Sequence, residues 1–278
     1  MTGRRMGMAF HESFPLNRTA IVKVLNVGME FGESVSSAVL RERTNLGPNY
    51  VKAMPRYARA CGLLNFESFA FTNFGQIAQV NDPDLMQAAT HWLMHYYLST
   101  PQGPGPLFWH HLITETLRLG NDIDSARVAI DIAHILSDQN ETIPAERTLR
   151  SAATVFLGSY SKSEGLSALD LLAPIKGGGF RVQATALPPP MAVAVALADY
   201  WAGPLGGRAT VDLDELMRPG GFLSLFFLGT EQANTILQAL QRARIVEVNR
   251  LAPPFQVVRL WDDPASVVAR LYEEGHSE

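Results

Sequence analysis

A tight turn at residues 45–48, Asn-Leu-Gly-Pro, constrains the fold more than any other feature of the sequence. It separates two segments, 33–43 and 48–61, whose apolar residues recur at the three- and four-residue spacing of an amphipathic helix. Pro48 suits the first turn of the second helix, because the amide hydrogen that it lacks would have no partner there. Two short helices joined by so sharp a turn must cross steeply, which is the geometry of a helix-turn-helix.

The segments on either side of this pair complete a small unit. Residues 17–28 predict a preceding helix that begins at a capping Asn17. After the pair, two apolar runs at 63–66 and 69–72 predict a hairpin. Helix, sharp turn, helix and hairpin is the order of a winged helix. We therefore predict an N-terminal winged helix-turn-helix over residues 1–80.

The helix pair presents polar and basic side chains on its outward side. Asn can read adenine and Arg can read guanine in the major groove, while Lys and Tyr suit phosphate contacts. The residues expected to contact DNA are Arg41, Arg43, Asn49, Tyr50, Lys52, Arg56 and Arg59. Pro55 lies within the second helix and removes a backbone hydrogen bond, so this helix either kinks there or is shorter than 48–61. Winged helices also serve as protein-binding modules, which is the alternative to DNA contact.

Charge is distributed unevenly along the chain. The protein carries a formal net charge of −4, yet residues 1–63 hold nine Lys or Arg and four Asp or Glu, a balance of +5. The remainder therefore carries −9. A basic head on an acidic body fits a local footprint for a polyanion. An uneven scatter of solvated charges is the alternative.

The rest of the chain predicts mainly helices. In the centre, helices are expected at 85–98, after a cap at Asp82, and at about 107–119, 125–138, 144–157 and 164–173. The C-terminal part predicts helices at 211–217, 230–244 and 263–274 and a hairpin of 245–248 with 255–260.

The predicted fold class is therefore mainly α with small β-wings. It combines the N-terminal winged helix with a central helical bundle over residues 81–180 and a C-terminal winged-helix-like unit over residues 181–278. The C-terminal unit has few basic residues, so its expected role is packing or homodimerisation rather than a second reading of bases.

Histidines form one candidate metal site. His91 and His95 share one face of a predicted helix, and His110 and His111 open the next helix. If the two helices pack together, His91, His95 and His111 could present three imidazoles to one metal ion. The alternative, which we favour, is that they are half-buried histidines hydrogen-bonded inside an aromatic core.

Carboxylates form a second candidate. Asp212, Asp214 and Glu215 stand close in the sequence, and magnesium-dependent nucleases need two or three converging carboxylates. Magnesium or another divalent metal is therefore the cofactor to consider. Acids at a helix start also stabilise the helix dipole, which is the alternative for this trio. No P-loop, dinucleotide-binding glycine motif, nucleophile elbow or nuclease E-x-K pattern occurs, so no catalytic residue is assigned.

The sequence carries no sign of a secretory or membrane destination. Its single cysteine, Cys61, excludes an internal disulfide. The first ten residues contain two arginines but lack the apolar core of a signal peptide. No apolar run approaches the ~18 residues of a membrane span. We expect a cytoplasmic protein.

An ordered set of short motifs runs through most of the chain. The set is HESFPL at 11–16, the Leu46–Gly47 turn, Gly62–Leu63–Leu64, DPDL at 82–85, THWLMHY at 90–96 and Phe108–Trp109. With these motifs in this order, the chain resembles the SspB family, first described as a conserved bacterial domain of unknown function. The resemblance extends from His11 to the closing helix.

SspB proteins accompany phage-defence systems that replace a non-bridging phosphate oxygen of DNA by sulfur. The resemblance implies double-stranded DNA, a cysteine desulfurase and an ATP-pyrophosphatase-type enzyme as partners. It also implies a metal-dependent nicking reaction that opens one strand of the duplex for sulfur insertion. It transfers no catalytic residue to this sequence.

Two hypotheses about function follow. The first is a DNA-nicking component of a phosphorothioation system, supported by the basic head, the predicted winged helix and the resemblance. The second is a non-catalytic DNA-binding adaptor or transcriptional regulator of the same system, which the missing nuclease signature favours.

Overall fold

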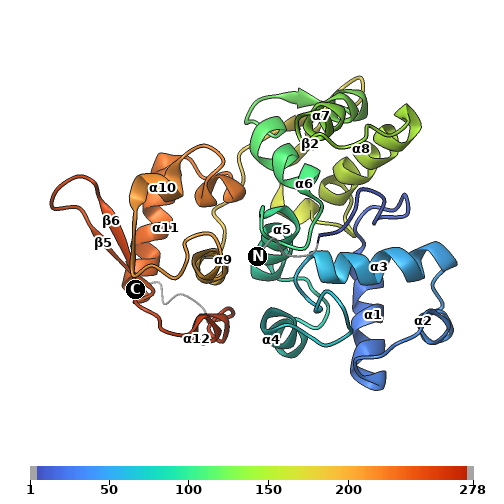
Figure 1. Ribbon diagram of the computed structural model, residues 1–278, viewed down its shortest axis with the longest axis horizontal. Coiled ribbons are helices and arrows are strands. Elements are labelled where there is room, and N and C mark those ends of the chain that lie inside the picture. The colour runs from blue at the N-terminus through green and yellow to red at the C-terminus, as the bar shows by residue number, and fades with distance from the viewer. Residues whose placement is uncertain (1–4, 274–278) are drawn as a thin grey trace.

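Helices dominate the structure, a computed structural model that describes residues 5–273 (Figure 1). Within these residues, helices α1 to α12 are accompanied by two small three-stranded antiparallel sheets. The predicted mainly α class is confirmed. None of the described helices is long and apolar enough to cross a membrane.

Four helices form the N-terminal unit: α1 (Arg18–Phe31), α2 (Ser37–Thr44), α3 (Pro48–Ala60) and α4 (Asn73–Asn81). The predicted cap of α1 is confirmed, because the side chain of Asn17 accepts a hydrogen bond from the amide of Ala20 at 2.8 Å. The predicted turn is confirmed as well, since α2 ends on Asn45 in a left-handed conformation and α3 begins at Pro48. α3 continues through the buried Pro55, so this proline does not shorten the helix.

The predicted N-terminal hairpin is reduced to a single β-bridge between Leu64 and Phe71, so the structure does not show a winged-helix arrangement here. The chain turns instead into α4, which the sequence patterns did not predict. The hydroxyl of Thr72 accepts a hydrogen bond from the amide of Gly75 at 2.9 Å and caps this helix. Gly75 lies so close to Leu63 that a Cβ would stand 1.9 Å from its carbonyl oxygen. The apolar run 69–72 therefore leads into the start of α4 and does not form a strand.

The central part contains α5 (Ala88–Ser99), α6 (Leu107–His111), β1 (Asp122–Ile123), α7 (Ser125–Asp138), α8 (Glu146–Ser161), β2 (Leu172–Pro174) and β3 (Phe180–Val182). α5 begins later than predicted, because the Asp82 carboxylate accepts the amide hydrogens of Met86 and Gln87 and holds the chain in a turn. A π-helical turn, Leu112–Thr116, continues α6.

The helix predicted at 164–173 is wrong. The chain makes only a 3-10 turn, Ser167–Leu169, and then enters β2, which pairs with β3. Asp170 adopts a left-handed conformation that a right-handed helix does not accept, and Pro174 has no amide hydrogen to continue one. The strands form a sheet in the order β1-β3-β2.

The C-terminal part contains α9 (Pro190–Ala202), β4 (Thr210–Asp212), α10 (Leu213–Met217), a 3-10 helix (Phe222–Phe226), α11 (Thr230–Arg242), β5 (Val246–Asn249), β6 (Gln256–Arg259) and α12 (Pro264–Val268). The predicted hairpin is confirmed as the antiparallel pair of β5 and β6. β4 joins on the other side of β6, which gives the order β4-β6-β5. α12 is shorter than the helix predicted over 263–274, of which Glu274 lies outside the described residues.

α5 lies at the centre of the molecule, between the N-terminal unit and α9 (Figure 1). Ten of its twelve residues are buried. α5 contacts α3, α6 and α9, and α12 contacts α4, so the N-terminal and C-terminal parts meet directly. One continuous hydrophobic core runs through all parts of the chain, and the predicted division into 1–80, 81–180 and 181–278 stays a prediction.

Candidate nucleic-acid interface

The predicted DNA-contact residues lie on α2 and α3, and the structure separates them by their partners. Arg41, Asn49 and Lys52 are exposed. Within residues 5–273, the side chains of Arg41 and Lys52 make no hydrogen bond and no ion pair. These two cations are therefore free to meet phosphates.

Two other arginines of the set are already paired. Arg43 lies 3.4 Å from a carboxylate oxygen of Glu30, and its guanidinium stands over the ring of Phe31. Arg56 donates a hydrogen bond of 2.7 Å to Glu12. Both pairs are partly exposed, so each contributes at most ~1 kcal/mol. A phosphate could therefore replace either carboxylate.

Tyr50 and Arg59 do not belong to the outward surface. The ring of Tyr50 packs on Phe14, with centroids 4.5 Å apart. The guanidinium of Arg59 lies 5.0 Å from the ring centroid of Phe69, and its Nε has no hydrogen-bond partner among the described residues. Burial lowers the pKa of this guanidinium. Arg59 lines a cleft to which α5 and α9 also contribute.

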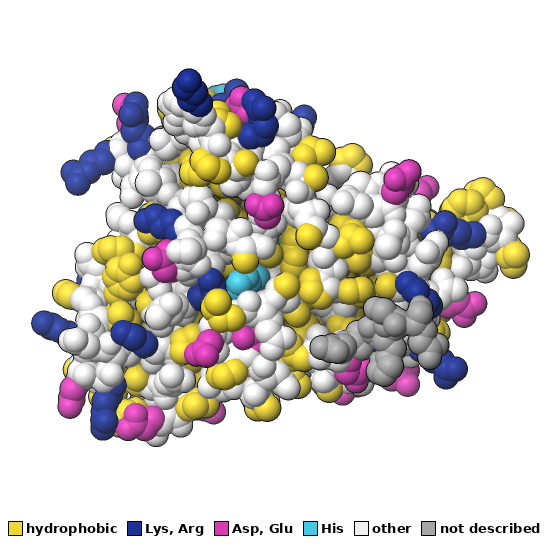
Figure 2. All heavy atoms as spheres, turned by 180° about the vertical axis from the view of Figure 1, so that it is seen from behind, with side chains coloured by type: hydrophobic (Ala, Val, Ile, Leu, Met, Phe, Trp, Pro, Cys, Tyr) yellow, Lys and Arg dark blue, Asp and Glu magenta, His cyan; other side chains and the backbone are white. Residues whose placement is uncertain are grey.

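The surface seen from behind has no continuous basic patch. Figure 2 shows Lys and Arg side chains scattered over this face, with Asp and Glu among them. A contact with DNA through α2 and α3 depends on the free Arg41 and Lys52 and on Arg43 and Arg56, which are already paired.

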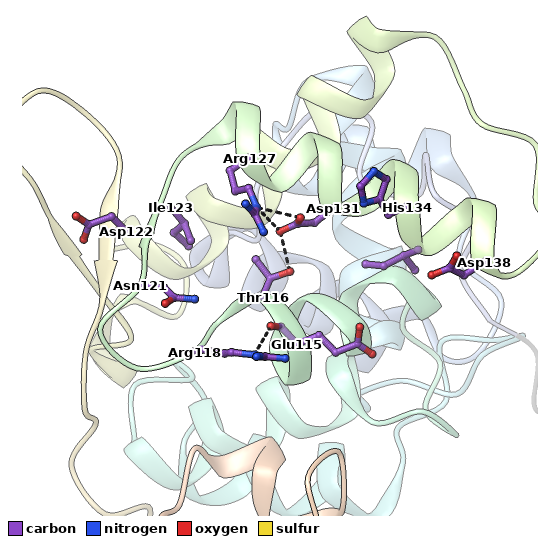
Figure 3. Close-up of a pocket in the computed structure, with 11 residues that line it drawn as sticks. Glu115, Thr116, Arg118, Asn121, Asp122, Ile123, Arg127, Asp131, His134 and Asp138 are labelled. Atoms are coloured by element: carbon purple, nitrogen blue, oxygen red, sulfur yellow. Dashed lines mark hydrogen bonds and ion pairs between the residues drawn. The ribbon is translucent and has the colours of Figure 1, made fainter.

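A cleft of about 600 Å³, which we call the polar cleft, lies between the π-helical turn, β1 and α7 (Figure 3). Its centre is Asp131, which accepts hydrogen bonds from Arg127 Nε at 3.1 Å and from Thr116 Oγ1 at 3.0 Å. Arg118 Nε donates to the backbone carbonyl of Glu115 at 2.9 Å. π-helical turns occur frequently at functional sites, and this one lies in a cleft lined by two guanidinium groups and four carboxylates.

The carboxylates around the polar cleft are largely committed to neighbours. Glu115 lies 2.6 Å from Nδ1 of His111. Asp122 accepts two hydrogen bonds from Arg181, at 2.7 and 2.8 Å, and this pairing lowers the pKa of Asp122. Within the described part of the chain, no group of three His, Cys, Asp or Glu side chains is arranged to hold a metal ion. These side chains do not fit a preformed magnesium site, so we derive no step through a metal.

The acidic trio of the C-terminal part marks a helix start. Asp212 is the N-cap of α10, and Asp214 and Glu215 lie in its first turn. Glu215 also accepts a hydrogen bond of 2.8 Å from Arg208. This is the placement expected from the helix-dipole alternative.

The candidate metal-binding histidines each have other partners. Nε2 of His91 lies 2.8 Å from the carbonyl of Leu85. His95 is buried between the hydroxyl of Tyr160, 2.9 Å from Nδ1, and the carbonyl of Leu225, 2.7 Å from Nε2. Burial lowers the pKa of His95 to about 4, which keeps the imidazole neutral. His91 and His95 are thus hydrogen-bonded inside the core, as the alternative to a metal site predicts. His111 pairs with Glu115. This geometry gives the metal hypothesis no support.

A second cleft, of about 360 Å³, lies where α3, α4 and the loop between them meet α5, α9 and α12, and we call it the junction cleft. Asp199 and Tyr97 line it together with Arg59. Only Arg59 had been singled out from the sequence. The other two escaped notice because they come from distant segments with no local motif, and only tertiary packing brings them together.

Comparison with known proteins places the chain in a family. The family described as "Protein of unknown function (DUF4007)" matches residues 8–258, and the chain belongs to it. No curated protein matches the chain.

Solved structures resemble the whole chain. One, described as "SspB crystal structure", matches with a TM-score of 0.76 at 16% identity, over 100% of this chain and 91% of that one. A second, "Magnesium ion-bound SspB crystal structure", has the same TM-score and identity and covers 97% of this chain and 89% of its own. The resemblance to SspB predicted from the motifs is confirmed. At this identity the likeness establishes the fold and assigns no residue a role.

Proposed function

We propose that this protein is a DNA-binding component of a bacterial DNA phosphorothioation system. The full-length likeness to SspB supports the system, and the exposed, unpaired Arg41 and Lys52 support the DNA contact. The net charge of +5 over residues 1–63 also supports contact with DNA.

α3 is the segment that we propose to enter the major groove. Asn49 and Lys52 lie on its exposed side about one turn apart, and Arg41 lies on α2. The Asn49 amide suits an adenine edge, whereas the cations suit phosphates. Arg43 and Arg56 join these contacts by exchanging their carboxylates for phosphates. The contact is led by about four phosphates, with modest base preference.

We further propose that the bound duplex is nicked on one strand, so that sulfur can enter the backbone there. Hydrolysis adds one water across a phosphodiester P–O bond and leaves a phosphate monoester and a free hydroxyl. The polar cleft is the proposed place for the strand, since Arg118 and Arg127 line it. A cysteine desulfurase and an ATP-pyrophosphatase-type enzyme would supply and activate the sulfur.

Conversion of supercoiled plasmid to open circles tests the nicking step. The expected result is an activity that keeps constant specific activity through successive purification steps and falls in Arg127→Ala. An activity that separates from the protein on further purification would contradict nicking by this chain.

A second function, that of a non-catalytic adaptor or transcriptional regulator, is favoured by one observation. Glu115, Asp122 and Asp131 are each held by a neighbouring imidazole, guanidinium or hydroxyl group. If Arg41→Ala/Lys52→Ala removes DNA binding while no divalent metal elicits cleavage by the intact protein, the adaptor is the correct function.

We propose that the C-terminal unit is winged-helix-like and serves packing or homodimerisation. The chain order α9, β4, α10, α11, β5 and β6, with β4 beside β6, supports the winged-helix assignment. The loop between β5 and β6 exposes Leu251 almost completely, at 95%. Sedimentation equilibrium of the full chain tests homodimerisation, because a monomer at all concentrations would exclude it.

A further inference from the structure

The junction cleft has the size and the lining of a site for a small planar ligand. Its volume of about 360 Å³ lies within the range of ligand pockets in proteins. Most of its lining is apolar, and the few polar side chains stand on different elements. Such sites hold a ligand by contact with its faces and orient it through the polar groups.

Asp199 supplies a hydrogen-bond acceptor inside the cleft. Tyr96 donates a hydrogen bond of 2.8 Å to its Oδ2. Asp199 is exposed, and within residues 5–273 its other side-chain oxygen accepts no hydrogen bond. The surrounding protein raises the pKa of the Asp199 carboxyl. An accessible acid with a raised pKa, set in a cleft, is typical of a functional site.

Arg59, on α3, supplies a donor in the same cleft. Its Nε is buried without a hydrogen-bond partner among the described residues. A buried, unpartnered donor is costly unless a ligand or water completes it. Acceptor and donor therefore both have unused capacity in the same cleft.

Aromatic side chains form much of the remaining wall. Phe74 and Tyr97 stack with their rings 20° from parallel and centroids 5.8 Å apart. Gly62 leaves room for the Tyr97 ring, because a Cβ there would stand 2.4 Å from it. Phe66, also in the lining, is half-buried and leaves part of its ring accessible.

The cleft adjoins the helix that we propose to bind DNA. Arg59 lies seven residues beyond Lys52 on α3, which is about 10 Å along the helix axis. A strand that runs from Lys52 along α3 would reach the cleft.

We propose that the junction cleft receives a single nucleobase turned out of an opened DNA strand. This inference rests on the proposed function. Unpaired bases are bound by stacking on aromatic side chains and by hydrogen bonds to their Watson–Crick edge. Every nucleobase carries an N–H on that edge for the Asp199 carboxylate, and Arg59 can donate to a ring or carbonyl acceptor.

The test compares three labelled duplexes by fluorescence anisotropy with the full chain. One is fully paired, one carries a single bulged cytosine, and one carries an abasic residue at the bulge. The bulged cytosine is expected to bind about tenfold more tightly than the abasic bulge, the gain typical of one stacked base. Equal affinity for the two bulges, with the paired duplex still bound, would overturn the role of the cleft but leave DNA binding intact. Loss of binding to all three duplexes would instead overturn the proposed function.

Variants test whether the difference in affinity between the two bulges arises in the cleft. Asp199→Ala and Tyr97→Leu are expected to equalise the two bulges without changing affinity for the paired duplex. Ala202→Trp, at the exposed end of α9, fills the cleft without disturbing the core and should do the same if Tyr97→Leu does not fold. Asp84→Ala, at an exposed aspartate outside the cleft, is the matched control and should keep the difference. A difference that persists in Ala202→Trp would contradict the proposal.

Free deoxycytidine distinguishes the two sources of a base. If the base comes from the strand, millimolar deoxycytidine should leave bulge binding nearly unchanged. If micromolar deoxycytidine abolishes the preference for the bulged cytosine, the cleft takes free nucleosides, and a base from a strand is excluded.

Discussion

The phenol of Tyr96 donates a hydrogen bond of 2.8 Å to the carboxylate of Asp199, and this contact joins α5 to α9. Tyr96 is fully buried and stacks on Phe226, whereas Asp199 opens into the junction cleft. Burial raises the pKa of both groups. The central helix and the wall of the cleft are thus tied by one polar contact.

Tyr96→Phe should destabilise the protein by about 0.5–1.5 kcal/mol, because it removes a hydrogen bond between two helices and water replaces the phenol at the exposed Asp199 carboxylate. Urea unfolding at neutral pH measures the change. Tyr97→Phe is the matched control, because no hydrogen bond of the Tyr97 hydroxyl occurs among the described residues, and it should change stability by less than ~0.5 kcal/mol. Equal losses in the two variants would show that the Tyr96–Asp199 contact is not stabilising.

Asp199→Asn should alter how stability depends on pH. The folded protein raises the pKa of Asp199, so the folded state holds this proton more tightly than the unfolded chain does. That contribution is complete below the ordinary aspartate pKa and is lost as pH rises through the folded value. The asparagine amide does not titrate in this range, so the variant should gain stability relative to the natural protein as pH rises from about 4 towards neutrality. Parallel pH profiles of the two proteins would contradict the raised pKa.

His95 should make the protein sensitive to acid. Its pKa is lowered by burial to about 4, so the folded state binds this proton less readily than the unfolded chain. The resulting stability is present above the unfolded pKa of about 6.5 and is lost as pH falls towards the folded value, a change of about 3 kcal/mol. His95→Gln cannot be protonated, and its unfolding free energy should fall less over this range. His11, whose pKa is also lowered to about 4, is common to both proteins and cancels in the comparison.

Gly75→Ala should be strongly destabilising, because the new Cβ would stand 1.9 Å from the Leu63 carbonyl oxygen, and backbone must move to admit it. Overpacking of this kind costs about 1–3 kcal/mol or more. Gly47→Ala is the control, since a Cβ there meets nothing within 4 Å and its φ is −63°. Thermal unfolding of both variants checks the difference, and a stable Gly75→Ala would mean that α4 does not pack as described.

Local signals account for what the sequence predicted correctly. Asn17 and Pro48 mark helix starts through their own chemistry, and the alternation in β5 and β6 needs only neighbouring residues. α4 has a local signal in its N-cap Thr72, but Gly75 in its first turn weakens the helical propensity, and the close packing of Gly75 against Leu63 appears only in the tertiary structure.

Long-range pairing accounts for most of what was missed. β1 pairs with β3 over a separation of 59 residues between Asp122 and Arg181, and two residues of strand leave no periodic pattern to detect. The junction cleft has the same origin. Arg59 was chosen as a DNA contact from its place on a helix face, but its actual surroundings depend on α5 and α9. A sequence pattern can identify one face of one helix. A site that several helices share is formed only when those helices pack together.

The salt dependence of DNA binding should report on Arg41 and Lys52 directly. If four phosphates are contacted, log affinity falls against log salt concentration with a slope of about −3.6, because each contact releases condensed counterions. Arg41→Ala/Lys52→Ala removes two contacts and should reduce the slope to about −1.8, with the largest loss of affinity at low salt. Lys176→Ala, an exposed lysine between β2 and β3, should leave the slope unchanged. An unchanged slope in the double variant would move the DNA contact away from α2 and α3, since the two free cations of that surface would then carry none of the phosphate binding.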